Sequence, residues 1–118
     1  MKDSLVLTKT RAFSVRIVRL CRYLREEKRE YILSKQLLRS GTSIGANVHE
    51  GKYGQSTDDF ISKHSIALKE AAETEYWLDL LYETDYLSKT EYESIINDCT
   101  DLVRMLTSIV NTTKNNKK

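Results

Sequence analysis

The chain of 118 residues contains no proline and only four glycines. Proline and glycine disfavour helix interiors more than any other residues, so almost every position of this chain can be helical. Folds made of many short strands need frequent turns, and those turns depend on the same two residues. Their scarcity argues against a β-sandwich or β-barrel and favours a few long helices.

Cysteine is also scarce, and long apolar runs are absent. Cys21 and Cys99 lie far apart in the chain, and neither has a second cysteine or a histidine at metal-ligand spacing. The longest uncharged runs, residues 40–48 and 105–113, are nine residues each, whereas a membrane-spanning helix needs about 20. No signal peptide is readable. We therefore expect a cytoplasmic protein with two small buried thiols and no membrane contact.

Apolar side chains recur at helical spacing in four segments. We expect helices at about residues 4–28, 33–50, 56–83 and 88–112. Ser56 provides an N-cap, Ser88 and Glu91 form a capping box, and the polar tail 111–118 should fray. The sequence thus predicts an all-α fold, a single domain over residues 1–118 that forms an antiparallel up-down-up-down four-helix bundle.

Several residues of the second and third helices have packing interpretations. Gly41 and Gly45 stand four positions apart, and such a ridge lets another helix approach closely. Glu75 falls on the apolar stripe of the third helix, where a carboxylate needs a partner. Arg39, Asn47 and Ser40 are candidate partners for it, and Trp77 adds apolar surface that one core-facing stripe does not explain.

The patterns that enzymes use are missing. No Glu-x-x-His pair suggests a metal site in the bundle, and neither cysteine has a neighbouring base. His64, on the apolar stripe of the third helix, has no carboxylate three or four positions away and is interpreted as a core histidine. The segment 41–45 lacks the Lys-Ser/Thr ending of a phosphate-binding loop. We expect no catalytic activity, no metal, no cofactor and no small-molecule substrate.

Charge is distributed unevenly along the chain. Residues 1–30 carry nine positive and four negative charges, whereas residues 56–87 carry two positive and eight negative charges. The outer half of the first helix is rich in arginine, and its candidate phosphate contacts are Arg11, Arg16, Arg19, Arg22 and Arg25. The alternative interpretations are a solvated face, or a face that pairs with the acidic third helix of a neighbouring subunit.

The central part of the chain resembles a known family. The relevant strings are Tyr-Ile-Leu-Ser-Lys-Gln-Leu-Leu-Arg-Ser-Gly-Thr-Ser-Ile-Gly-Ala-Asn at 31–47, Asp-Phe-Ile-Ser-Lys at 59–63, Ala-Leu-Lys-Glu-Ala at 67–71 and Glu-Thr-Glu-Tyr-Trp-Leu at 73–78. They resemble the bacterial 23S rRNA intervening-sequence proteins, and the likeness extends over essentially the whole chain. It implies a four-helix bundle that assembles into a homopentameric ring without enzymatic activity. A related branch serves as the accessory protein of diversity-generating retroelements.

Two functional hypotheses follow. In the first, a homo-oligomer, expected to be pentameric, binds RNA or a nucleoprotein through the arginines of the first helix. In the second, the protein is a structural protein–protein adaptor that binds no nucleic acid, and the arginines meet acidic third helices between subunits. Under either hypothesis, the resemblance makes the valines among these arginines and the extra apolar surface of the third helix candidate subunit contacts.

Overall fold

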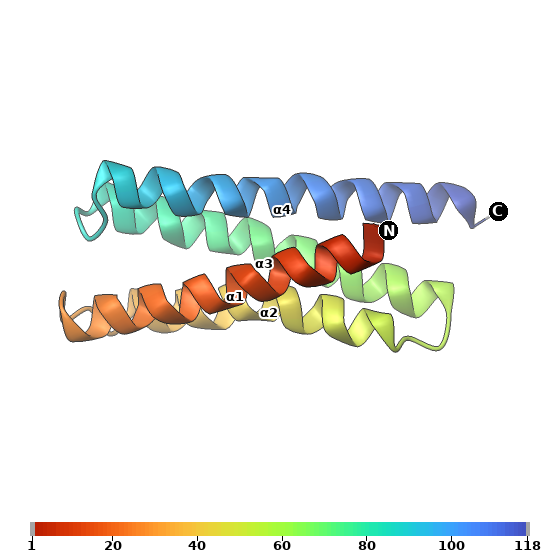
Figure 1. Cartoon of the computed structure of the whole chain (residues 1–118), viewed down its shortest axis with the longest axis horizontal. Coiled ribbons are helices and arrows are strands. Elements are labelled where there is room, and N and C mark those ends of the chain that lie inside the picture. Colours follow the sequence, from red (N-terminus) through yellow and green to blue (C-terminus); the bar gives the residue numbers. More distant parts are fainter. Residues whose placement is uncertain (1, 118) are drawn as a thin grey trace.

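The computed structural model describes residues 2–117, which form four α-helices and no strand (Figure 1). The helices are α1 (Lys2–Glu26), α2 (Leu33–Lys52), α3 (Thr57–Glu83) and α4 (Lys89–Asn116). They run antiparallel along one axis of a rod with extents of 49 × 21 × 20 Å. The prediction of an all-α four-helix bundle is confirmed.

The packing order follows the chain order. α2 packs against α1 and α3, and α3 packs against α4, whereas the contact between α1 and α4 is sparser. Within residues 2–117, no Cα atom of α1 lies within 8 Å of one in α3, and the same holds for α2 and α4, so these pairs occupy the diagonals of the bundle. The core is mainly aliphatic, and its fully buried members include Ile17, Leu37, Ile44, Leu78 and Leu106.

Two of the helix starts follow the sequence pattern. Ser56 Oγ accepts a hydrogen bond from the Asp59 amide at 3.1 Å. Ser88 Oγ accepts from the Glu91 amide, and the Glu91 carboxylate accepts from the Ser88 amide. Both predicted caps are confirmed, and each satisfies amide groups that have no partner inside the helix.

α2 begins in a way that the sequence pattern did not indicate. The buried carboxylate of Glu30 accepts hydrogen bonds from the amides of Ile32, Leu33 and Ser34 at 2.6–3.1 Å. Arg29, just before it, has a φ of 57° in the left-handed region, which reverses the chain between α1 and α2. This turn ends α1 at Glu26 rather than at residue 28.

α4 is longer than expected. It continues to Asn116, so the prediction of a frayed tail from residue 111 is wrong within the described part of the chain. Ile109 and Val110 are buried, and the Thr113 hydroxyl donates to the Ile109 carbonyl at 2.7 Å. Tertiary burial of this last apolar pair therefore outweighs the polar composition of the tail. No helix within residues 2–117 has the length and apolarity to cross a membrane.

Candidate nucleic-acid interface

The outer side of α1 is where the predicted arginines lie. The core-facing stripe of this helix includes Phe13, Ile17 and Leu24, each at most 2% exposed. Every residue out of phase with that stripe is turned toward solvent or toward a neighbouring helix. Arg11, Arg19, Arg22 and Arg25 are exposed. None of these four guanidinium groups forms an ion pair with any residue in the 2–117 range.

Arg16 is different from the other predicted arginines. Its guanidinium pairs with the Asp98 carboxylate of α4 and also donates to the Ser94 hydroxyl at 2.9 Å. Arg16 is five positions after Arg11, which places it about 140° around the helix. That rotation turns it toward α4 and makes it a tie between the two helices. The predicted set therefore divides into four free cations and one structural cation.

Three of the four free arginines border the seam between α1 and α2, and Arg19 faces solvent. Arg22 and Arg25 line a shallow groove with Leu38 of α2, and the exposed ring of Tyr31 stands beside them. Arg11 lines a second groove along the same seam, near the end of α2. We call Arg11, Arg19, Arg22 and Arg25 together the α1 arginines.

Three cationic or titratable side chains outside the five predicted contacts extend this surface. Arg29 lines the groove beside Arg25, and Lys52 and His49 line the groove beside Arg11. Arg29 continues the arginine pattern of the first segment and lies in the turn before α2, and Lys52 lies in the last turn of α2. Helical periodicity within α1 could not find Lys52 and His49, because they come close to α1 only through the reversal of the chain.

The two glycines of α2 mark the closest approach between α1 and α2. A Cβ on Gly41 would lie 2.8 Å from the Ile17 side chain, and a Cβ on Gly45 would lie 2.9 Å from Ser14 Oγ and 3.2 Å from the Thr10 carbonyl oxygen. Such distances leave no room for a side chain without movement of α1. The ridge therefore acts as the predicted packing surface, and α1 is its partner.

Arg39 and Trp77 meet on the other side of α2. The Arg39 guanidinium pairs with the carboxylates of Glu70 and Glu73, and the Trp77 indole donates to Glu73 at 3.0 Å. The pKa of Glu73 is lowered, first by the Trp77 hydrogen bond and then, against some burial, by Arg39. Arg39 is thus a tie between α2 and α3 and takes no part in the basic surface.

The expected surroundings of Glu75 are corrected by the structure. Its neighbour Thr74 takes the buried position, where its hydroxyl bonds to Ser40, and Glu75 is only half-buried on the α4 side. Asn47 donates to the Ser43 carbonyl and not to Glu75. The pKa of Glu75 is raised by burial and by the charge of Asp79. The predicted partners of Glu75 were wrong because the buried stripe of α3 passes through Thr74 and not, as predicted, through Glu75.

The remaining titratable groups form no reactive or metal-binding arrangement in the described chain. Burial raises the pKa of both Cys21 and Cys99 to about 12, which keeps them as thiols. Across residues 2–117, no three His, Cys, Asp or Glu side chains come together in a way that could hold a metal ion. The most distinctive surface of the described chain is therefore the row of unpaired arginines.

The fold and the surface together define a class of protein, namely a small four-helix bundle in which cations lie along the seam between its first two helices. Residues 2–108 match the model of the 23S rRNA-intervening sequence protein family. The chain belongs to this family, as its resemblance predicted. No curated protein gives a significant match.

A solved structure supports the same assignment. It is the crystal structure of a protein of unknown function from the S23 ribosomal protein family of Bacteroides thetaiotaomicron VPI-5482. The two chains are 54% identical and superpose with a TM-score of 0.92, over 94% of this chain and 99% of the other. At this identity the fold and the helix register of the two proteins correspond.

Proposed function

We propose that this protein is a non-catalytic, homo-oligomeric bundle that binds RNA, alone or in a nucleoprotein, through the α1 arginines. The observation that carries the proposal is that all four are exposed and free of ion pairs within residues 2–117. Guanidinium groups bind phosphate oxygens in a bidentate manner and also stack on bases. A row of them along one helix offers repeated contacts to a single nucleic-acid strand.

The separation of charge in the bundle supports this proposal. The acidic helix α3 lies diagonally opposite α1 in the bundle. No carboxylate of α3 forms an ion pair with an α1 arginine in the described chain. Two of the α3 carboxylates, Glu70 and Glu73, are already paired with Arg39. The positive potential at the α1–α2 seam remains available to an external anion.

Assembly is the second part of the proposal. Val15 and Val18 of α1 are 40% and 39% exposed, and Ile66 and Tyr76 of α3 are 39% and 59% exposed. Because α1 and α3 lie on a diagonal, contact between α1 of one subunit and α3 of the next is heterologous and closes into a ring when the rotation permits. Family resemblance makes five subunits the expected number, in a ring in the cytoplasm that repeats the α1 arginines.

The first experiment measures mass and bound nucleic acid together. Freshly purified protein passes over a sizing column with light scattering and with absorbance recorded at 260 and 280 nm. A mass near five protomers with excess absorbance at 260 nm supports the proposal. A monomer at all concentrations contradicts the assembly, and a clean pentamer favours the adaptor alternative below.

The second experiment tests the arginines directly. The double variant Arg22→Glu/Arg25→Glu should bind single-stranded RNA more weakly and with a flatter salt dependence. Loss of two phosphate contacts lowers the slope of log K against log salt by about 1.4. Lys89→Glu/Arg104→Glu is the matched control, because it makes the same change in net charge at two exposed positions of α4. Equal retention of RNA by both double variants would rule out the α1 arginines as the binding surface.

A protein–protein adaptor is the alternative function. The exposed apolar residues on α1 and α3, flanked by opposite charges, are the observation that favours it. Here the α1 arginines pair with α3 of the neighbouring subunit. Arg22→Glu/Arg25→Glu would then dissociate the oligomer, and the wild-type protein would bind no nucleic acid at any salt concentration. The two experiments above distinguish the alternatives.

A further inference from the structure

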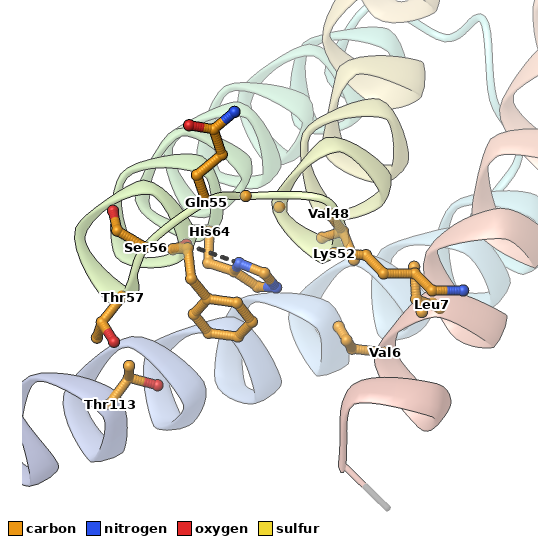
Figure 2. A pocket seen from close by; sticks show the side chains of 12 residues that line it. Val6, Leu7, Val48, Lys52, Gln55, Ser56, Thr57, His64 and Thr113 are labelled. Atoms are coloured by element: carbon orange, nitrogen blue, oxygen red, sulfur yellow. Dashed lines mark hydrogen bonds between the residues drawn. The ribbon is translucent and has the colours of Figure 1, made fainter.

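One end of the bundle contains a pocket that the proposed function does not use. It lies where the α2–α3 loop meets the start of α1 and the end of α4 (Figure 2). Its volume of about 560 Å³ is typical of small-molecule sites, which span roughly 300–1,000 Å³. Val6, Val48 and Phe60 give it apolar walls, and Thr57 and Thr113 place hydroxyl groups on one side.

His64 supplies a fixed hydrogen-bond acceptor in this pocket. The residue is only 2% exposed, and its Nδ1 lies 2.8 Å from the Phe60 carbonyl oxygen. A carbonyl oxygen can only accept, so Nδ1 carries the proton and Nε2 of the neutral ring is an acceptor. Nε2 has no hydrogen-bond partner within residues 2–117. In Figure 2 it points toward the side of the pocket formed by Val6 and Val48.

The His64 ring cannot easily turn away. It stacks on the Phe60 ring with a centroid distance of 3.9 Å and an interplanar angle of 24°. On its other side it lies against Gly51, where an added Cβ would be 2.8 Å from His64 Cε1. The absence of a side chain at Gly51 is what admits the ring. The acceptor is therefore held in place before any ligand arrives, which lowers the entropic cost of binding.

A cationic groove adjoins the pocket. It runs along the α1–α2 seam, is lined by Arg11, His49 and Lys52, and shares Leu7 and Lys52 with the pocket. Thr10 and Ser14 also line it, and their hydroxyl groups donate to the carbonyl oxygens of Val6 and Thr10. An open pocket with some apolar walls and one acceptor thus stands directly beside a groove with two permanent cations.

The carboxylates around this end are occupied. Glu50, which also lines the groove, pairs with Lys63 at 2.8 Å, and this pairing lowers its pKa. Asp58 pairs with Lys117, and Asp59 accepts from the Gln55 amide. Their partners offset the repulsion that these carboxylates would exert on an anion in the groove.

We infer that the pocket and the groove together bind one nucleotide unit, with the base in the pocket and its phosphate in the groove. A base amino or imino group donates to His64 Nε2, the base packs between Val6, Val48 and the edge of Phe60, and the phosphate contacts Lys52 and Arg11. The inference rests on the proposed function, because Arg11 belongs to both surfaces. The same chemistry is offered by a base in a single-stranded RNA and by a free nucleotide.

The experiment follows His64 by NMR in the full-length protein. The long-range ¹H–¹⁵N spectrum of its ring is recorded during titration with a ten-nucleotide oligoadenylate RNA and, separately, with AMP. Thr57→Trp is the main variant, since Thr57 is exposed and lines the pocket, so a bulky ring there closes it without disturbing the core. Thr90→Trp is the matched control, in the first turn of α4 at the opposite end of the bundle. His64→Asn is a second variant that can keep the bond to Phe60 and removes Nε2.

The expected result is an upfield shift of the His64 Nε2 resonance on titration with the RNA. Both pocket variants should weaken RNA binding by about tenfold, the effect of losing one base contact, while Thr90→Trp binds as the wild type does. The same shift with AMP extends the site to free nucleotides. An unchanged Nε2 resonance with RNA binding intact overturns the inference and leaves the proposed function standing. If the RNA does not bind, a shift with AMP supports the pocket alone, and no shift with either ligand overturns it.

Discussion

The α1–α2 half of the molecule, residues 1–55, carries a net charge of +7, and the remainder carries −5. The two halves also differ in how their helices meet. α1 and α2 approach at glycines, so their seam is narrow and its cations stay outside. In the α3–α4 half, polar groups lie between the helices: the Tyr92 hydroxyl donates to Asp79 at 2.5 Å, and Glu75 is half-buried nearby. The comparison shows that most cations of the α1–α2 seam stay exposed, whereas some carboxylates of the other half lie between its helices.

The largest expected effect comes from filling the glycine seam. Gly41→Val should lower the free energy of unfolding by about 3 kcal/mol, since its side chain would overlap Ile17 in a packed core. Ala46→Val, an exposed position on the same helix, should cost less than about 1 kcal/mol from helix propensity alone. Urea denaturation of the two variants measures the difference. Equal stability of both would mean that the seam is not tightly packed.

The next comparison is between the α1–α2 turn, which contains Glu30, and the α3–α4 turn, which contains Ser88. Glu30→Ala should cost about 2 kcal/mol, because three amides, that of buried Ser34 among them, lose their acceptor. Ser88→Ala removes a cap that is exposed to solvent, so we expect about 1 kcal/mol. Thermal and chemical denaturation provide the measurement. If the serine variant were the less stable of the two, the buried carboxylate would contribute less than its geometry implies.

Much of the fold was predictable, and the exceptions have physical reasons. Helical periodicity and local caps such as Ser88 with Glu91 depend only on residues near in sequence. The Glu30 cap depends on the left-handed turn at Arg29, for which residue type gives little signal.

At the candidate site, the exposure of four arginines followed from the helical wheel. A helical wheel shows which way a side chain points but not what lies beside it. It therefore could not distinguish Arg16, which faces α4, from Arg19, which faces solvent. For the same reason it did not bring Lys52 to the surface formed by α1. The wheel predicted that Glu75 is buried, whereas Thr74 is the buried residue. A shift of one residue rotates the buried direction by about 100°, which is enough to change which of the two is buried.

Arg16 offers a smaller but more selective test. Arg16→Gln should lower the free energy of unfolding by about 0.7 kcal/mol, the size of an exposed ion pair with additional hydrogen bonds. Arg19→Gln should have almost no effect on stability, since Arg19 is exposed and has no ion pair in the described chain. For RNA binding we expect the reverse: Arg19→Gln flattens the salt dependence and Arg16→Gln does not. Identical behaviour of both variants in either assay would remove the distinction between structural and free arginines.

The smallest expected effect concerns the acidic half and its dependence on pH. The pKa of Glu75 is raised in the fold by burial and by Asp79, so the folded protein binds the proton on Glu75 more tightly than the unfolded chain does. This group stabilises the fold below its unfolded pKa, and the contribution is lost as pH rises through its folded pKa. Glu75→Gln resembles the protonated form, so it should be more stable than the wild type by about 0.5 kcal/mol at pH 7, and the difference should vanish in acid.

Urea denaturation at several pH values tests this, with Glu83→Gln, an exposed position on the same helix, as the control. A Glu75 advantage that is equal at pH 7 and in acid would show that Gln acts through packing and not through charge. A pH-dependent advantage would instead show that the charged form of Glu75 destabilises the fold, because its carboxylate is half-buried beside the charge of Asp79.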